Sequence, residues 1–355
     1  MHQESRTGVK VEGRTKNRRP ILATVAELAG VSVPTVSKVI NGRVDVAPDT
    51  RARIEAALVE LGYESPMKRR ARAAMPPAVE LVFGGMNEGY SLELLKGMLQ
   101  EAAGEGVELV LSSMAPANLR EADHEEWARR MVESGRAGLI LVTSEMTVEQ
   151  LALFRAWNIP VVIIDPYNPP DSGFASVGAT NWAGGKGAVE HLIGLGHRKI
   201  AHIGGPVAAE CSVARQHGYL AALMGHGIEV RPEYMAMGAF SNSFGSQWAR
   251  TMLDLDDPPT AIFTGNDSIA IGVLGEAQRR GIRVPEELSV VGFDGTALGG
   301  QVLPRLTSVA QPLQEMGRAA LRSVLRMSRR EGLESPRMEL ATTLVVRDST
   351  APPPA

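Results

Sequence analysis

The stretch from Val25 to Asn41 constrains the fold of this chain most, because it contains two short helical patterns joined by a glycine turn. The first pattern has one apolar face, formed by Val25, Leu28 and Ala29. The second repeats apolar residues at i, i+3 and i+4, at Val36, Val39 and Ile40. Gly30 favours the left-handed conformation that ends a helix, and Ser32 suits the cap of the next one. The pattern predicts a helix-turn-helix, whose second helix would enter the major groove of DNA.

Two short helices joined by glycine usually indicate only local packing, but this stretch carries a more specific run: Ala29-Gly-Val-Ser32, Thr35-Val-Ser37 and Asn41-Gly42. We expect Lys38 to donate to guanine, and Val33 and Pro34 to contact apolar groups such as a thymine methyl. Thr35 and Ser37 are expected to contact phosphates or to support the turn. The predicted DNA-reading residues of this stretch are Ser32, Val33, Pro34, Thr35, Ser37, Lys38 and Asn41.

This run resembles the DNA-binding domain of the lactose/galactose repressor family, and the similarity continues to the C-terminus. The segment Arg43–Tyr63 matches the third helix of the family, with Pro48 in its first turn, where a missing N–H costs little. Ala47 stands where the family usually has a serine cap, so about 1 kcal/mol of capping is absent. Apolar side chains should close a small three-helix core at Ile54, Ala57, Leu58 and Leu61.

Composition describes a globular protein without a membrane segment. The 355 residues are 44% hydrophobic and 22% charged, which suits two or three folding units. There is no run of about 18 apolar residues, and the N-terminus lacks the apolar core of a secretory signal. Cys211 is the only cysteine, which excludes an intramolecular disulfide and a cysteine-based zinc site. We therefore expect a cytoplasmic protein with no metal and no other cofactor.

The net charge of −3 hides an asymmetry along the chain. Residues 1–76 hold 14 Lys and Arg against 8 Asp and Glu, whereas the remaining residues hold 23 against 32. A basic head on an acidic body fits a phosphate-binding module attached to a part that need not touch DNA. A basic terminus can also be a solvated tail, so the asymmetry supports DNA binding without establishing it.

Changes in composition predict the domain boundaries. We expect a disordered basic arm over residues 1–20, the helix-turn-helix domain over 21–64, a hinge linker over 65–77, a two-lobed effector-binding and dimerisation domain over 78–350, and a tail over 351–355. In the linker, Lys68, Arg69 and Arg70 should attract phosphates. In the family, the corresponding segment forms a hinge helix whose leucine wedges into the minor groove. That position falls at Arg72 here, a side chain that suits a narrow minor groove.

From Val79 onward, short apolar runs alternate with amphipathic stretches, which predicts an α/β fold with parallel sheets. The expected strands are Val79–Phe83, Val107–Leu111, Gly138–Val142, Val161–Asp165, Ile200–Ile203, Ala261–Phe263 and Leu288–Phe293. The expected helices include Leu92–Ala103, Ala183–Leu195, Ala214–Met224 and Asp267–Arg280. The family resemblance implies two such lobes, as in periplasmic binding proteins that close around a ligand. A nucleotide-binding enzyme is the alternative, but Gly184-Gly-Lys-Gly187 lacks the spacing of a phosphate loop and no catalytic set stands out.

Ligands of open α/β sheets bind beyond the carboxyl ends of the strands, and the resemblance assigns effector contacts there. The expected contacts are Tyr90, Ser144, Trp182, Arg215, Phe240, Asn266, Asp294 and Gln311, the last in the final crossover. Arg215 is the strongest of these, because its fork of donors suits vicinal hydroxyls. Asp267 is expected to cap the following helix, which leaves Asn266 free for the ligand.

Aromatic rings together with Arg, Asn and Asp suit a neutral polyhydroxyl ligand, although a purine would also use the aromatic side chains. The segments Gly178–Gly185 and Cys211–Arg215 resemble those of repressors that respond to xylose- or cellobiose-type saccharides. The chain is therefore expected to be a repressor, not an enzyme, that binds near-palindromic operator DNA as a homodimer under the control of a sugar. A sugar-binding transport component would share the two-lobed body, but it would need an export signal and no helix-turn-helix.

Overall fold

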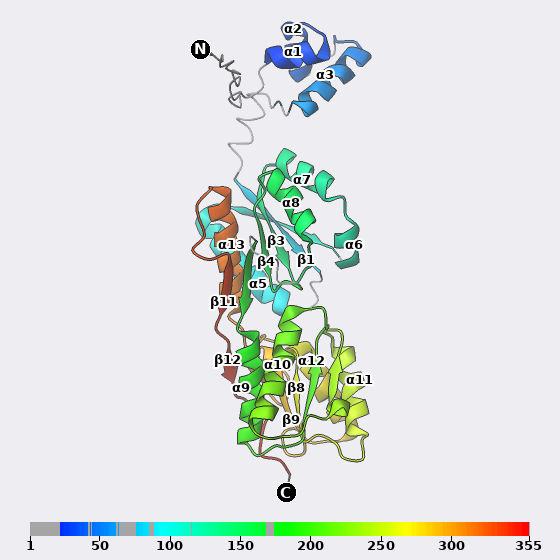
Figure 1. Ribbon diagram of the computed structural model, residues 1–355, viewed down its shortest axis with the longest axis vertical. Coiled ribbons are helices and arrows are strands. Elements are labelled where there is room, and N and C mark those ends of the chain that lie inside the picture. Colours follow the sequence, from blue (N-terminus) through cyan, green and yellow to red (C-terminus); the bar gives the residue numbers. More distant parts are fainter. Residues whose placement is uncertain are drawn as a thin grey trace, which may run out of the picture. The chain divides into compact units, whose positions relative to one another are not determined.

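The computed structural model describes residues 22–41, 43, 45–61, 63, 76–84, 89–114, 116–167 and 174–354. The chain divides into two compact units, Met1–Met75 and Pro76–Ala355 (Figure 1). The basic arm predicted over residues 1–20 lies outside the described residues. In the part of the chain that is described, no single helix is long and apolar enough to cross a membrane, and only the sharply bent pair Leu22–Ala29 and Val33–Ile40 reaches that composition together.

The first unit consists of α1 (Leu22–Ala29), α2 (Val33–Ile40) and α3 (Pro48–Glu60). Its core contains the apolar faces predicted from the sequence, with Val25, Ala29, Val36, Val39, Ile54 and Ala57 buried. The turn between α1 and α2 confirms the role of Gly30, whose φ is 64°. One expectation is wrong in detail, because Leu28 points outward, with 46% of its surface exposed. Ser32 is the N-cap residue of α2 as expected, but its hydroxyl contacts Thr35 Oγ1 at 2.8 Å and makes no bond to the helix backbone.

The first lobe of the second unit is a six-stranded sheet in the order β11-β5-β4-β3-β1-β2, with every strand pair parallel. Its strands are β1 (Ala78–Phe83), β2 (Glu108–Ser113), β3 (Arg136–Val142), β4 (Val161–Ile164), β5 (Ala175–Ala179) and β11 (Arg337–Leu340). Its helices are α5 (Gly89–Glu105), α6 (Pro116–Glu121), α7 (His124–Glu133), α8 (Val148–Ala156) and α13 (Leu313–Ser328). Alternate side chains of the strands pack against α5 and α13 on one face and against α7 and α8 on the other. Burial on both faces explains the continuous apolar runs.

The second lobe repeats this arrangement, with the strand order β12-β10-β9-β8-β6-β7 and only β12 antiparallel to its neighbour. Its strands are β6 (Ile200–Gly204), β7 (Met235–Met237), β8 (Ala261–Thr264), β9 (Ser289–Asp294), β10 (Thr307–Ala310) and β12 (Thr343–Val345). Its helices are α9 (Asn181–Gly194), α10 (Glu210–Gly225), the short 3-10 helix η1 (Pro232–Tyr234), α11 (Asn242–Leu253) and α12 (Asp267–Arg280). Helices α9 and α10 cover one face of the sheet, and α11 and α12 cover the other.

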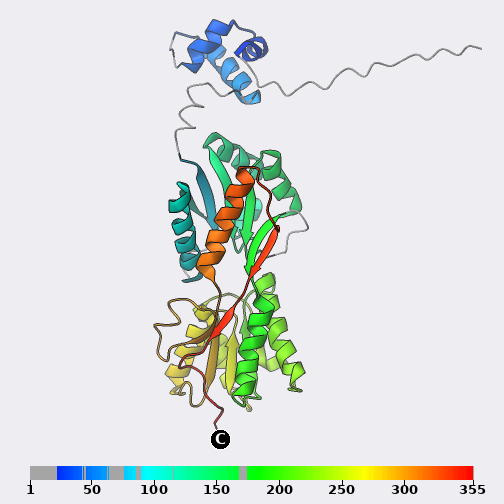
Figure 2. The same cartoon turned by 90° about the vertical axis from the view of Figure 1, so that its left-hand side faces the viewer.

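The chain crosses between the lobes three times: from β5 to α9, from β10 to α13, and from β11 to β12. Figure 2 shows the last crossing, in which the C-terminal segment adds one strand to each lobe. Gln311 lies in the second crossing, so its expected place in the final one is wrong. The first and third crossings are joined by hydrogen bonds from Thr342 N to Thr180 Oγ1 (3.0 Å) and from Thr180 N to Leu340 O (2.9 Å). These bonds join two of the three connections, and the three connections together form the hinge between the lobes.

Candidate functional site

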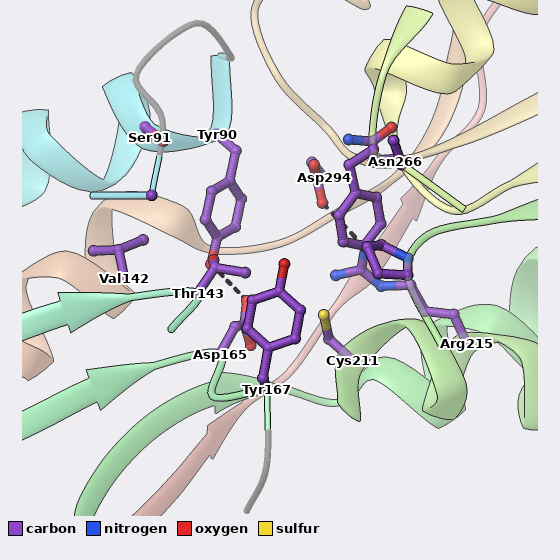
Figure 3. Close-up of a pocket in the computed structure, with 14 residues that line it drawn as sticks. Tyr90, Ser91, Val142, Thr143, Asp165, Tyr167, Cys211, Arg215, Asn266 and Asp294 are labelled. Atoms are coloured by element: carbon purple, nitrogen blue, oxygen red, sulfur yellow. Dashed lines mark hydrogen bonds and ion pairs between the residues drawn. The ribbon is translucent and has the colours of Figure 1, made fainter. Parts of the chain in front are cut away.

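A cavity of about 340 Å³ lies where the carboxyl ends of both sheets face each other (Figure 3). The first lobe contributes Tyr90 from the start of α5 and Asp165 from the residue after β4. The second lobe contributes Arg215 from α10 and Asp294 from the end of β9. Five of the predicted contacts line this cavity: Tyr90, Arg215, Phe240, Asn266 and Asp294. Its volume is in the range of about 300–1,000 Å³ that is usual for small-ligand sites.

Arg215 is the most constrained side chain of the cavity, with 2% of its surface exposed. Its Nε donates to Asn181 Oδ1 at 2.8 Å, its Nη1 donates to the carbonyl oxygen of Gly265 at 2.6 Å, and Nη1 lies 3.6 Å from Asp294 Oδ1. The guanidinium carbon also sits 3.8 Å from the centre of the Phe293 ring. A buried cation held in this way costs little reorganisation when a ligand binds, because its orientation is already set.

Partly buried Tyr90 and buried Asp165 form a pair, in which the phenol donates to Asp165 Oδ2 at 2.6 Å. Burial and the neighbouring carboxylate raise the pKa of Tyr90 well above its ordinary value, so the phenol keeps its proton. Burial also raises the pKa of Asp165, opposed by the charge of Arg215 and by the bond from Tyr90. Asp165 was not predicted as a site residue, although it is a carboxylate at a strand's carboxyl end, the same signal that selected Asp294.

The helix cap before α12 is Asn266, so the expectation that Asp267 caps this helix is wrong. Asn266 is the N-cap of α12, where its Oδ1 accepts from Ile269 N at 2.9 Å, and it still lines the cavity. Asp267 is buried and accepts from Thr296 N at 2.7 Å and from Ser308 Oγ at 2.6 Å. Burial raises the pKa of Asp267, and these hydrogen bonds lower it. Asp267 therefore holds the loop after β9 and does not cap the helix.

Three predicted contacts lie outside the lining of this cavity. Ser144 is buried and donates to the carbonyl oxygen of Val142 at 3.0 Å. Trp182 lines a neighbouring cavity. Gln311 does not line the cavity, but its Nε2 donates to Asp294 Oδ1 at 2.7 Å. The cavity is also lined by Thr143, Tyr167 and Cys211, none of which was predicted as an effector contact.

Cys211 is a neutral side chain in this site. Burial is the main cause that raises the pKa of its thiol to about 12. The thiol therefore contributes a small apolar surface to the wall and no reactive thiolate. Within the described ranges, no group of three or more His, Cys, Asp or Glu is placed to hold a metal ion.

The second helix of the helix-turn-helix exposes most of the residues predicted to read DNA. Ser32, Val33, Pro34, Lys38 and Asn41 are exposed, and Thr35 and Ser37 are partly buried. Lys38 Nζ donates to Asp45 Oδ2 at 2.7 Å, and this bond lowers the pKa of Asp45. The Asn41 side chain donates to the carbonyl oxygen of Ser37 at 2.8 Å and closes the end of α2. The predicted phosphate contacts Lys68, Arg69, Arg70 and Arg72 lie outside the described residues.

Comparison with known proteins identifies the family. Residues 22–65 match the bacterial regulatory proteins of the lacI family, and residues 189–350 match the periplasmic binding protein-like domain. The chain is 31% identical over 327 residues to the HTH-type transcriptional repressor CytR of Escherichia coli K12, covering 92% of this chain and 95% of that protein. The chain belongs to the LacI family. This LacI-family protein is therefore a DNA-binding transcriptional regulator, as its sequence predicts.

Other family members match along nearly the whole chain. The HTH-type transcriptional regulator CelR of Thermobifida fusca is 31% identical over 343 residues, with 94% of this chain and 99% of that protein covered. The solved CelR–cellobiose complex gives a TM-score of 0.69 at 30% identity and covers 93% of this chain and 100% of that one. The Lac repressor dimer bound to operator and the anti-inducer ONPF gives 0.69 at 25% identity, covering 94% and 100%. The relatives are regulators of transcription, not enzymes, and their structures confirm the predicted fold class.

Proposed function

We propose that this LacI-family protein is a repressor that binds near-palindromic operator DNA as a homodimer, and that a small sugar or oligosaccharide between its lobes controls its operator affinity. The observation that carries the effector part is the buried pair of Arg215 and Asp294, 3.6 Å apart, in a cavity also lined by Tyr90 and Phe240. The guanidinium of Arg215 can only donate hydrogen bonds to a ligand, and the carboxylate of Asp294 can only accept them.

The chemistry of this cavity favours a neutral polyhydroxyl ligand. Hydroxyl groups both donate and accept, so one sugar ring can satisfy Arg215 and Asp294 together, while the Tyr90 and Phe240 rings cover its apolar faces. The charges of Arg215 and Asp294 offset each other. A charged ligand would leave one of them uncompensated in a buried site, which costs free energy.

Ligand binding would favour closure of the two lobes. Tyr90 and Asp165 belong to the first lobe, whereas Arg215 and Asp294 belong to the second, so a ligand that contacts both pairs bridges the hinge. Such a ligand shifts the population of closed molecules in proportion to its preference for that state. Operator affinity changes only if the closed and open states differ in their affinity for DNA.

The DNA part of the proposal rests on the exposed face of α2. In a twofold dimer, two such helices would enter successive major grooves, with Lys38 donating to guanine and Val33 and Pro34 making apolar contacts. The linker residues Lys68, Arg69, Arg70 and Arg72 would add salt-dependent attraction to the phosphates. A homodimer accounts for a near-palindromic site, because the symmetry of the protein is then repeated in the DNA.

Footprinting and ligand screening of the purified full-length protein test this proposal together. Thermal-shift screening against mono-, di- and oligosaccharides and purines identifies the effector, and footprinting of genomic fragments with and without it locates the operator. We expect Asp294→Asn to lose the response to a saccharide while retaining the footprint. Asp256→Asn, an exposed substitution in the same lobe, is the matched control.

The results that contradict the proposal are specific. No protected DNA site under any ligand condition would refute the repressor. A thermal shift with purines and none with saccharides would refute the sugar effector, since nucleobases also stack on aromatic rings. A normal saccharide response in Asp294→Asn would remove this carboxylate from the binding site.

A further inference from the structure

A second cavity, of about 510 Å³, adjoins the central one and has Asp165 and Cys211 as lining residues in common with it. The first lobe provides β5 and β11, and the second provides the first turns of α9 and α10. Gly178 of β5 lies in this lining, and a Cβ there would be 3.3 Å from Asp165 Oδ1. A ligand of the first cavity that is extended past Asp165 would enter the second one.

The most unusual side chain of this second cavity is Trp182, the second residue of α9. Its indole is 48% exposed, although it lines a cavity of a size that binds small molecules. Phe174 lies in the same lining, so the cavity offers two aromatic rings. A partly exposed indole that lines a cavity is suited to stack on a ligand that is apolar on its faces and polar at its edge.

The polar groups around the indole disfavour an anionic ligand and offer acceptors to hydroxyl groups. Arg337 Nη2 lies 2.9 Å from Glu210 Oε1 across the lobes and 2.9 Å from Glu339 Oε1 within β11. With Asp165, the lining holds three carboxyl groups and one guanidinium. This excess of carboxylates disfavours phosphates and other anions. Carboxylate acceptors beside aromatic rings suit the hydroxyl groups of a carbohydrate.

We infer that the second cavity is a subsite for a further sugar unit, stacked on Trp182, so that the effector is a saccharide of at least two units. This inference rests on the proposed function, because it extends the same site from one sugar ring to two. It differs from that proposal in its consequence: affinity depends on chain length, and Trp182 determines that dependence.

Calorimetric titration of the full-length protein with glucose, cellobiose and cellotriose, and with xylose, xylobiose and xylotriose, tests the inference. We expect the disaccharide of the recognised series to bind at least tenfold more tightly than its monosaccharide. Trp182→Ala should remove most of this increment, and Trp182→Phe should retain most of it, because a smaller ring still stacks. Trp157→Ala is the control, since this indole is 36% exposed but lies outside both cavities.

The possible results distinguish the second subsite from the proposed sugar effector. A monosaccharide that binds as tightly as its disaccharide, or an unchanged increment in Trp182→Ala, overturns the second subsite and leaves the proposed sugar effector in place. An equal loss in Trp157→Ala also overturns it, because the effect would then follow from removing any exposed indole. If neither series binds, the sugar effector and the subsite are both refuted.

Discussion

Gly218→Ala tests how the fold holds the guanidinium of Arg215 in place. Helices α9 and α10 cross closely enough that a Cβ at Gly218 would lie 2.3 Å from Trp182 O and 2.6 Å from Lys186 N. Both atoms belong to the backbone, so they cannot rotate away, and the helices must separate by about 1 Å to reach an ordinary contact. Overpacking of this kind costs about 1–3 kcal/mol, and the better helix propensity of alanine offsets about 1 kcal/mol of it. Because the obstacle is backbone, we expect a net loss of about 2 kcal/mol.

Urea unfolding followed by tryptophan fluorescence measures this loss. The signal reports only the unit Pro76–Ala355, because all four tryptophans lie in it, at positions 127, 157, 182 and 248. Gly187→Ala is the matched control, since a Cβ there meets nothing within 4 Å and should stabilise α9 by about 1 kcal/mol. Arg215 precedes Gly218 by one helical turn, so Gly218→Ala should also weaken effector binding. A urea midpoint at or above that of the wild type would refute the argument.

Three further predictions follow from single residues. Lys38→Ala should reduce discrimination between the operator and unrelated DNA in binding assays, with effector binding unchanged; equal discrimination would contradict the assignment of α2. Asn266→Ala should lower the free energy of unfolding by about 1 kcal/mol through loss of the cap of α12, and Asn266→Ser should not. Burial lowers the pKa of His202 to about 4 from 6.5, so the unfolded chain binds a proton that the folded chain rejects. Stability should therefore fall by about 3 kcal/mol as the pH drops from 6.5 to 4, and His202→Gln should reduce this dependence in urea titrations at several pH values.

The sequence predicted the elements that depend on local pattern. The glycine turn at Gly30, the start of α3 at Pro48 and the seven strands β1 to β4, β6, β8 and β9 follow from backbone preference and apolar runs. The strands β5, β7, β10, β11 and β12 were not predicted. Of these, β11 and β12 are short and partly exposed, and their pairing depends on residues far along the chain. Leu28 faces solvent for a similar reason. The pattern of α1 defines an apolar stripe, but α2 and α3 decide how much of it they cover.

The site was predicted as a set of residue types, and the structure adds which of them act on one another. Asn266 and Asp267 are adjacent acceptors, and either can cap a helix. The choice is made by Thr296 and Ser308, whose donors hold the Asp267 carboxylate. The preference for Asn266 as the cap therefore depends on the loop after β9 and on β10, so the sequence around α12 alone does not predict it. The same holds for Asp165, whose role depends on the phenol of Tyr90, 75 residues away.

The hydrogen bonds of the cavity continue into the hinge, which gives a ligand a physical connection to the relative movement of the lobes. Asp294, which faces Arg215, accepts from Gln311 Nε2 in the second crossing. Arg215 in turn donates to Asn181, the first residue after the first crossing. A ligand that takes hydrogen bonds from Arg215 or Asp294 therefore competes with bonds that stabilise two of the three connections. The coupling free energy between effector and operator depends on how differently the open and closed states satisfy the hydrogen bonds of these groups. Because these groups already contact the connections between the lobes, no long chain of intervening residues is needed to link the ligand to lobe movement.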